Sequence, residues 1–230
     1  MNKDTFNQAL KSQMPILESM LEQFEKYADY LYEQNQYLNL TAINDRSEVY
    51  EKHFYDSILI QSLIPEHSLV ADIGSGAGFP GICLAIVRPD CQFTLVEALT
   101  KRCRFLEAII TRLGLKNVII LNQRAEDCAN MHEEFDCVTA RAVANLSILM
   151  ELCLPLVKVK GSMIAMKGLK AQEEVDEAKH AFVLLNASLE KIQQIDLPSA
   201  GVRNNILIRK NKATDPKYPR VYGQIKKNPL

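Results

Sequence analysis

The sequence predicts an α/β protein with a doubly wound, mostly parallel sheet, preceded by a helical N-terminal extension. Three observations lead to this prediction. After Pro65, short apolar runs of strand length alternate with amphipathic stretches, which is the pattern of βαβ units. Residues 1–66 show helical spacing of their apolar residues and no strand pattern. A glycine-rich stretch, residues 69–81, joins the first predicted strand to a helix.

The N-terminal extension should contain about three helices packed on the sheet domain. From Met14 to Tyr37, apolar side chains recur at steps of three and four residues, as on one face of an amphipathic helix. A second helix is predicted over residues 47–63, after the polar hinge NLTAIND. We therefore divide the chain into a helical extension, residues 1–66, and a second domain, residues 67–230.

The elements of the second domain follow from the alternation of its sequence. Short runs rich in branched and aromatic residues predict strands, and the amphipathic stretches between them predict helices. The predicted strands are 69–74, 93–98, 117–122, 135–141, 161–168, 188–197 and 204–210, and the predicted helices are 79–87, 100–114, 145–158 and 171–185. Because strand and helix alternate up to residue 185, most strands should be parallel.

The stretch LVADIGSGAGFPG is typical of a loop that holds a small molecule. A buried strand ending in Asp72 runs into Gly74, Gly76 and Gly78, and a helix opens near Phe79. Glycines let a backbone turn sharply and approach a ligand, and the helix N-terminus offers free N–H donors.

Two ligand classes fit this loop. Its last glycines satisfy the dinucleotide pattern G-x-G-x-x-G, but the strand leads into Gly74 through an acidic residue, which is the wrong register for that pattern. The arrangement Asp-x-Gly-x-Gly-x-Gly resembles the S-adenosylmethionine (SAM) site of Rossmann-like methyltransferases. Glu97, at the end of the next strand, could accept both ribose hydroxyls in either class. An NAD(P)-binding oxidoreductase therefore stays open as an alternative.

Polar residues follow the next two strands at the same edge of the sheet. Ligands of open α/β sheets bind beyond the carboxyl ends of the strands, so the turn at residues 123–127 should flank an adenine. Arg141 ends the following strand and should lie beside the methyl-transfer axis. A buried ion pair of Arg141 with Asp136 or Glu126 is the structural alternative.

The methyl acceptor can be narrowed by what the sequence lacks. Amino-nitrogen methylases of adenine have a D/N-P-P-Y/F box after the fourth strand, where this sequence reads TARAVANL. Pyrimidine C5 methylases need a cysteine nucleophile in this region, but Cys153 lies in the middle of a predicted helix, on its apolar face. A ring nitrogen needs neither device because its lone pair attacks the sulfonium directly. A small molecule or protein is the alternative acceptor.

Composition sets further limits. The 230 residues are 47% hydrophobic and 24% charged, with a net charge of −1, as in an ordinary globular protein. No run approaches the roughly 18 apolar residues of a membrane span, and the N-terminus lacks the apolar stretch of a signal peptide, so we expect a cytoplasmic protein without membrane contact. The six cysteines form no C-x-x-C pair, which indicates reduced core thiols and no metal site.

The charge is concentrated at the two ends of the chain. Residues 1–66 hold 11 acids and 5 bases, whereas residues 209–230 hold 7 bases and one acid. This basic tail could bind a polyanion or could be a solvated end. Two tyrosines alternate with its bases and would offer stacking faces to RNA. Because the glycine loop lies more than a hundred residues earlier, it need not touch the tail, and we expect neutralising the tail's charges to leave SAM affinity almost unchanged.

Several strings together resemble the RsmG family, the bacterial 16S ribosomal RNA guanine-N7 methyltransferases once called glucose-inhibited division protein B. The match runs over nearly the whole chain. Its strings are NLTAI (39–43), EKHFYDSI (51–58), DIGSGAGFPGICLAI (72–86), LVEALTKRCRFLEAI (95–109), QRAEDC (123–128), FDCVTARAVANL (135–146), Lys167-Gly168 and YPRVYGQIKKNPL (218–230). Cys83 departs from the family, which more often has proline there, and we expect little consequence.

The resemblance implies a fold, a reaction and a set of residues. The fold would be the Rossmann-like class I SAM-dependent methyltransferase fold with a seven-stranded sheet, and the substrate would be guanine 527 in the 530 loop of 16S rRNA. The protein would act as a monomer on the small ribosomal subunit. By resemblance and by position in the loop, SAM would be held by Asp72, Gly74, Gly76, Gly78, Phe79, Glu97, Ala125, Glu126 and Arg141, with Arg141 also catalytic, and RNA would be bound by Lys167, Lys217, Arg220 and Lys226.

Overall fold

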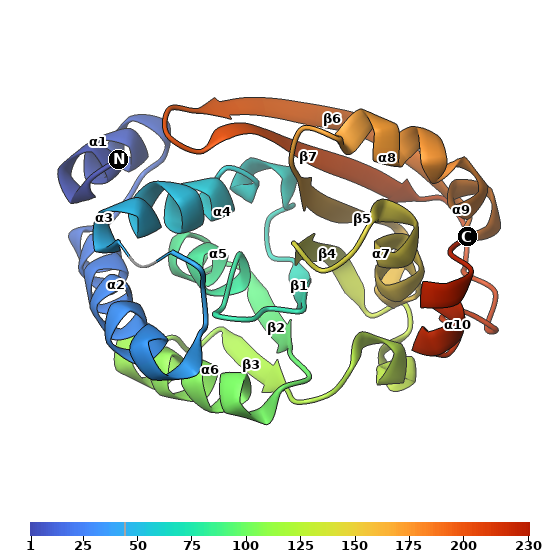
Figure 1. The fold of residues 1–230 in the computed structure, drawn as a ribbon, viewed down its shortest axis with the longest axis horizontal. Helices are drawn as coiled ribbons and strands as arrows, with labels where there is room; N and C mark the ends of the chain where they lie inside the picture. Colours follow the sequence, from blue (N-terminus) through green and yellow to red (C-terminus); the bar gives the residue numbers. More distant parts are fainter. Residues whose placement is uncertain (44) are drawn as a thin grey trace.

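A seven-stranded sheet runs through the middle of the computed structural model, which describes residues 1–43 and 45–230 (Figure 1). The strand order is β3-β2-β1-β4-β5-β7-β6. The first five strands are parallel, and β7 is antiparallel to both β5 and β6. The strands are β1 (Leu69–Ile73), β2 (Gln92–Val96), β3 (Val118–Leu121), β4 (Phe135–Arg141), β5 (Val157–Lys167), β6 (Ala187–Leu197) and β7 (Gly201–Lys210).

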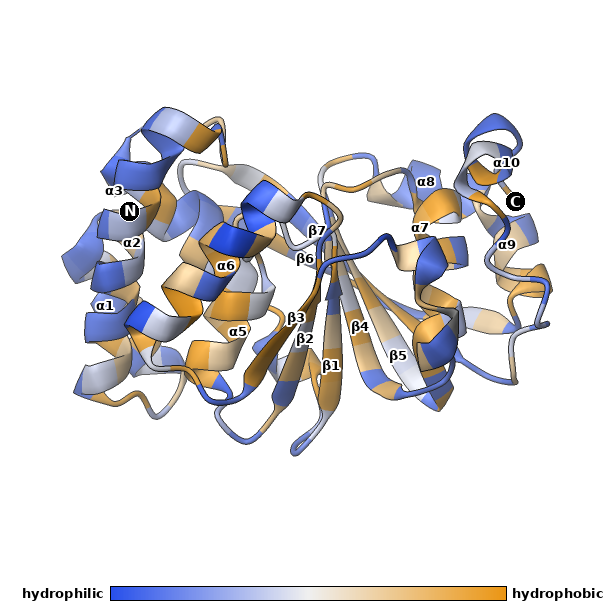
Figure 2. Cartoon of the chain, turned by 90° about the horizontal axis from the view of Figure 1, so that it is seen from below, coloured by the Kyte–Doolittle hydropathy of each residue, from blue (hydrophilic) through white to orange (hydrophobic). Residues whose placement is uncertain are grey.

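Helices cover both faces of this sheet, so the central strands β1, β2 and β4 are mostly buried (Figure 2). The helices α5 and α6, together with the N-terminal helices, lie on one face, and α7 to α10 lie on the other (Figure 2). The helices are α1 (Lys3–Gln13), α2 (Glu18–Leu38), α3 (Arg46–Val49), α4 (Asp56–Ile58), α5 (Gly81–Val87), α6 (Thr100–Leu113), α7 (Leu146–Cys153), α8 (Ala171–Glu177), α9 (Lys179–Leu184) and α10 (Tyr222–Lys227). The doubly wound sheet confirms the predicted fold class.

The N-terminal helices share a hydrophobic core with the sheet domain. Phe6 and Phe24 are fully buried and lie edge to face, with ring centres 5.1 Å apart. The same apolar cluster continues into Phe79, at the glycine loop, and Phe105, on α6. This packing brings the extension over the carboxyl-end region of the sheet, where the glycine loop lies. The boundary at residue 66 stays a prediction.

The predicted helix over residues 47–63 is composite. It consists of α3, a π-helical segment at Tyr50–Tyr55, α4 and a 3-10 turn at Gln61–Leu63. Ile64 is extended, with φ −94° and ψ 121°, because the following Pro65 disfavours helical backbone before it. Asn44, in the predicted hinge, lies outside the described residues.

The structure also corrects the boundary between α7 and β5. The predicted helix 145–158 ends at Cys153, since Pro155 lacks the N–H that would continue it and lies in a 3-10 turn. β5 therefore begins at Val157, four residues earlier than predicted. All six cysteines are buried and unpaired, as expected for core thiols. In the described chain no helix is long and apolar enough to span a membrane.

Candidate active site

The loop after β1 turns so that its backbone faces the end of β2. Gly74, Gly76 and Gly78 have φ values of 69°, 59° and 95°, a conformation that glycine adopts without strain. The N–H groups of Gly74 and Ser75 donate to the carbonyl of Val96 at 2.9 and 3.2 Å. These two bonds hold the loop against the end of β2, at the edge of the sheet where the parallel strands end.

Asp72 lies beneath this loop and holds it in place. Its side chain is fully buried, and its carboxylate accepts hydrogen bonds from the N–H of Gly81 at 3.1 Å and the hydroxyl of Thr139 at 3.2 Å. Burial raises the pKa of Asp72 to about 6, against these hydrogen bonds. The sequence predicts Asp72 as a cofactor residue, whereas the structure places it as the brace between the loop and α5.

Glu97, just beyond β2, directs its carboxylate at the glycine loop. Its Oε2 accepts the N–H of Gly76 at 2.9 Å, and its Oε1 accepts the N–H of Leu99 at 2.8 Å. The side chain is 4% exposed, and Nη1 of Arg102 lies 3.7 Å from Oε2. Both oxygens are thereby fixed, and their remaining lone pairs can accept the two hydroxyls of a ribose.

A pocket of about 300 Å³ opens at the carboxyl ends of β1 to β4. Four of the predicted cofactor residues line it, namely Gly74, Glu97, Ala125 and Glu126. The other lining residues are Ile73, Val96, Ala98, Arg102, Gln123, Arg124, Ala142, Val143, Leu152 and Tyr222. The remaining predicted positions are not part of this lining: Asp72, Gly76, Gly78, Phe79 and Arg141. We call this space the cofactor pocket.

The cofactor pocket has the chemistry that SAM requires. Glu97 stands ready for a ribose, and Leu152 provides apolar surface for an adenine ring. Arg102 lines the pocket and could pair with the amino-acid carboxylate, and its buried Nε has no hydrogen-bond partner among the described residues. A Cβ on Gly74 would lie 2.8 Å from a methyl group of Val143, at the pocket wall, so the cradle requires glycine.

Replacing Glu97 by alanine should weaken binding of S-adenosylhomocysteine by about 1.5–3 kcal/mol, the usual scale for hydrogen bonds to a charged group. Isothermal titration calorimetry measures the change. Thr100→Ala is the matched control, because the Thr100 hydroxyl is bonded to Asn122 nearby and lies outside the pocket lining. Unchanged affinity in a folded Glu97→Ala variant would move the ribose contact elsewhere.

Arg141, the last residue of β4, points away from the cofactor pocket. Its Nη1 donates to Oδ2 of Asp56 at 3.1 Å and to the carbonyl of Lys52 at 3.4 Å. Its Nη2 lies 3.2 Å from Nδ1 of His53, and its guanidinium carbon lies 4.9 Å from the centre of the Phe79 ring. The three hydrogen-bond partners come from the helical extension, whereas Phe79 belongs to the sheet domain. Arg141 therefore joins the two parts of the chain.

A second pocket, of about 420 Å³, surrounds this arginine. Its lining is Ile43, Lys52, His53, Asp56, Arg141, Ala142, Met166, Lys167, Gly168 and Arg203. We call it the acceptor pocket. Ala142 lines both pockets, so they adjoin at the end of β4. The partners considered from the sequence, Asp136 and Glu126, lie outside this lining.

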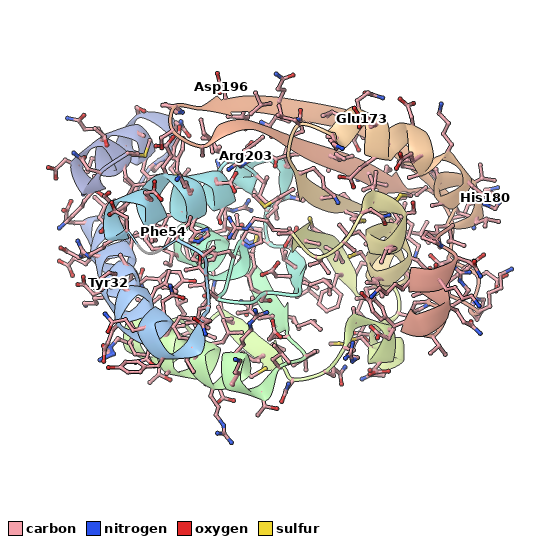
Figure 3. All side chains as sticks on the ribbon, viewed as in Figure 1. Tyr32, Phe54, Glu173, His180, Asp196 and Arg203 are labelled. Carbon is pink, nitrogen blue, oxygen red and sulfur yellow. The ribbon has the colours of Figure 1, made fainter. Side chains whose placement is uncertain are left out.

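Asp56 is the negative centre of the acceptor pocket. It is 4% exposed and lies between two guanidinium groups, with Nε of Arg203 at 3.4 Å from Oδ1. Arg203 belongs to β7, and Figure 3 shows it on the part of that strand next to α4, the helix that begins at Asp56. Burial raises the pKa of Asp56, although Arg141 and Arg203 both lower it.

His53 is held neutral between Phe79 and Arg141. Its ring stacks on Phe79, with centres 4.4 Å apart and planes at 20°. Burial first, and then the positive charge of Arg141, lowers the pKa of His53 to about 3. Because arginine can only donate, Nδ1 must accept, and Nε2 carries the proton that it donates to Oγ1 of Thr41 at 2.7 Å. The neutral ring therefore fixes the orientation of Arg141.

This pKa makes the stability of the protein depend on pH. Between pH 3 and 6.5 the unfolded chain carries a proton on His53 that the folded chain lacks, so the free energy of unfolding falls as the pH falls through this window. From pH 6.5 to 5 the loss due to His53 should be about 2 kcal/mol. Urea unfolding of wild type and His53→Gln at both pH values isolates this contribution. Equal losses in the two proteins would contradict a neutral His53.

Residues 20–203 match the family model described as GidB, rRNA small subunit methyltransferase G. The chain belongs to this family. It is 42% identical to the rRNA small subunit methyltransferases G of Lactobacillus helveticus, over 239 residues, and of Streptococcus pneumoniae, over 237 residues, with 100% of both chains covered in each case. The resemblance to this family that the sequence showed is thereby confirmed.

Two solved structures share the fold. A SAM-dependent methyltransferase from Aquifex aeolicus has a TM-score of 0.58 at 16% identity, over 75% of this chain and 97% of that one. TYW2 from M. jannaschii, in complex with SAM, has a TM-score of 0.56 at 16% identity, over 69% of this chain and 75% of that one. The fold is the Rossmann-like methyltransferase fold, and SAM is the cofactor of the family.

The predicted RNA residues fall into two groups on this rRNA methyltransferase G fold. Lys167 lines the acceptor pocket, although its ammonium group also pairs with Glu174 at 2.7 Å. Lys217 and Lys226 are exposed on the tail. Arg220 is bonded through Nε and Nη2 of its guanidinium to the buried carboxylate of Glu151, so an RNA contact would have to share this partner.

The tail reaches the cofactor pocket, a contact that the sequence did not require. Tyr222 lines this pocket together with Gly74. Tyr218 is 5% exposed, so its ring packs in the core and offers no face to RNA. The family model ends at residue 203, so this tail lies outside the part of the chain that the model matches.

Sequence reasoning did not assign His53, Asp56, Arg203 or Tyr222 to either pocket. The string EKHFYDSI contains a usable signal, because His53 and Asp56 are three residues apart and share one face of a helix. Arg203 lies near the start of the antiparallel strand β7, so the rule that ligands bind at the carboxyl ends of parallel strands does not identify it. The acceptor pocket of this chain therefore depends on the extension as much as on the sheet.

Proposed function

We propose that this chain transfers the methyl group of SAM to N7 of guanine 527 in 16S rRNA of the small ribosomal subunit. The observation that carries the proposal is the full-length identity of 42% to rRNA small subunit methyltransferases G. The two adjoining pockets support it, because one has the chemistry for SAM and the other lies beside it with room for a base.

The acceptor pocket suits a ring nitrogen. SAM supplies an electrophilic methyl group, and N7 of guanine carries a lone pair and no proton, so no general base is required. The work of the chain is to orient the base, which the fixed guanidinium of Arg141 can do by donating to an acceptor edge. The methylated base is cationic, and Asp56 supplies a nearby negative charge while His53 adds no positive one.

Positive side chains around the acceptor pocket would bind the RNA backbone. Lys52, Lys167 and Arg203 line its rim, and Lys217 and Lys226 are exposed on the tail. The extension, residues 1–66, would act as one wall of the RNA site. We further propose that the protein works as a monomer in the cytoplasm, where ribosomal subunits are assembled.

The proposal is tested by methyl transfer from labelled SAM to four substrates: 16S rRNA, the assembled small subunit, and each of these with guanine 527 replaced by adenine. Label should enter only the substrates that contain guanine 527, and nucleoside digestion should yield 7-methylguanosine. Equal transfer to the adenine-substituted substrates would contradict the position. Transfer to no RNA, with SAM still bound, would favour a small-molecule or protein acceptor.

A further inference from the structure

The C-terminal tail, residues 211–230, returns to the side of the sheet on which SAM is expected. It comes after the edge pair β6 and β7 and ends in α10, which packs on α7 (Figure 1). The first residue of α10, Tyr222, is a wall of the cofactor pocket. Tyr222 thus lines the same cavity as Gly74 of the glycine loop, although more than 140 residues separate the two in sequence.

An ion pair between Arg220 and a buried carboxylate fixes the tail in this position. Nε and Nη2 of Arg220 donate to the two carboxylate oxygens of Glu151, at 2.7 and 2.6 Å, and the backbone N–H of Arg220 donates to the same carboxylate at 3.0 Å. Glu151 lies on α7 with a fully buried side chain. Three donors on one buried carboxylate make this a clamp of defined geometry, placed two residues before Tyr222.

Apolar anchors hold the tail on both sides of the clamp. Tyr218 is 5% exposed and Ile225 is fully buried, and both belong to the main hydrophobic cluster around α7. Tyr222 is partly buried and packs against the same cluster. Only one face of α10 is therefore committed to the core, and its lysines, Lys226 and Lys227, are exposed.

Tyr222 stands at the end of the pocket where an adenine is expected. The guanidinium carbon of Arg124, from the turn after β3, lies 6.0 Å from the centre of the Tyr222 ring. Leu152 on α7 lines the same region. An aromatic ring and an apolar side chain, next to the carboxylate of Glu97, form a site for the base and ribose of a nucleoside.

We propose that the C-terminal tail is a cofactor-binding element, in which Tyr222 packs against the adenosyl group of SAM and the Arg220–Glu151 pair positions it. The inference rests on the proposed function for the presence of SAM in this pocket. Because the matched family model stops at residue 203, this wall lies in a segment beyond that model. The basic charge of the tail then belongs to a segment whose inner face binds cofactor.

The chain contains no tryptophan, which allows a direct optical test. Tyr222→Trp places a single fluorophore in the proposed wall, and Tyr37→Trp places one at a 77% exposed site on α2 as the matched control. Titration with S-adenosylhomocysteine should change the emission of the Tyr222→Trp protein with a midpoint equal to the calorimetric Kd. The emission of the Tyr37→Trp protein should stay constant.

Two further variants keep the test decisive if tryptophan itself disturbs the pocket. Tyr222→Phe should bind S-adenosylhomocysteine as wild type does, and Tyr222→Ala should bind it about 10-fold more weakly, the scale of one aromatic–base contact. In the Tyr222→Trp background, Arg220→Lys should reduce both affinity and emission change, because lysine cannot make the bidentate contact.

The outcomes separate the two proposals. If wild type binds S-adenosylhomocysteine but Tyr222→Ala binds equally well and the Tyr222→Trp emission does not respond, the tail is not a cofactor wall and the proposed function stands. If wild type does not bind S-adenosylhomocysteine at all, the proposed function fails and this inference fails with it.

Discussion

Replacing Arg141 by alanine should lower the turnover of methyl transfer about 100-fold or more, while affinity for S-adenosylhomocysteine changes far less. Arg141 lies outside the lining of the cofactor pocket and is oriented in the acceptor pocket by Asp56, His53 and the carbonyl of Lys52. Loss of the group that orients the base should therefore act on the reaction step, where a misplacement of about 1 Å can cost a factor of about 100. Single-turnover transfer to the small subunit, per folded molecule, measures the effect.

The control for this experiment is Arg209→Ala. Arg209 lies near the end of β7, whereas Arg203 of the acceptor pocket lies near its start. Arg209 pairs with the exposed Glu190, and its replacement should leave turnover unchanged. Removing Arg141 also leaves Asp56 with one guanidinium fewer, so some loss of stability is expected, and the melting temperature should be recorded for both variants. A variant that melts much earlier but keeps wild-type turnover per folded molecule would show that Arg141 is only a structural ion pair.

Replacing Gly74 by valine should abolish cofactor binding in a protein that still folds. The φ of Gly74 is 69°, which costs an L-residue roughly 1–2 kcal/mol. Its Cβ would lie 2.8 Å from Val143 at the wall of the cofactor pocket, and a branched side chain would extend further into the same space. Calorimetry with S-adenosylhomocysteine should detect no binding, and circular dichroism should show a cooperative transition.

Gly114→Val separates backbone strain from loss of the pocket. Gly114 has nearly the same φ, 67°, and a Cβ there would meet nothing within 4 Å. It ends α6, away from the glycine loop. Both variants should lose similar stability, and only Gly74→Val should lose the cofactor. Near-wild-type affinity in a folded Gly74→Val protein would remove the glycine loop from the binding site.

The sheet domain was predictable because its signals are local. Each parallel strand is a short apolar run, and strand ends meet at one edge of the sheet, so Gly74, Glu97 and the Ala125–Glu126 turn could be placed together from sequence alone. The burial of Asp72 could not be predicted, because the pattern Asp-x-Gly does not determine whether the carboxylate faces the ligand or the loop. Here the loop required it, through the N–H of Gly81.

The acceptor pocket was less accessible to sequence reasoning because its contacts are distant in the chain. Arg141 and Asp56 are separated by 85 positions, and they meet only because the extension packs over the end of β4. Arg220 and Glu151 are separated by 69 positions, and their pairing holds the basic tail against α7. A charge count shows that the tail is basic, but it does not show which arginine has a buried partner.

Methylation of guanine N7 at position 527 of 16S rRNA is tested most directly in cells that lack this protein. Mass mapping of the modified nucleosides in their rRNA is the measurement, with complementation by wild type and by Arg141→Ala. We expect 7-methylguanosine to be missing at position 527 alone, wild type to restore it, and Arg141→Ala to fail to restore it. An unchanged modification map in the cells that lack the protein would contradict the proposed reaction.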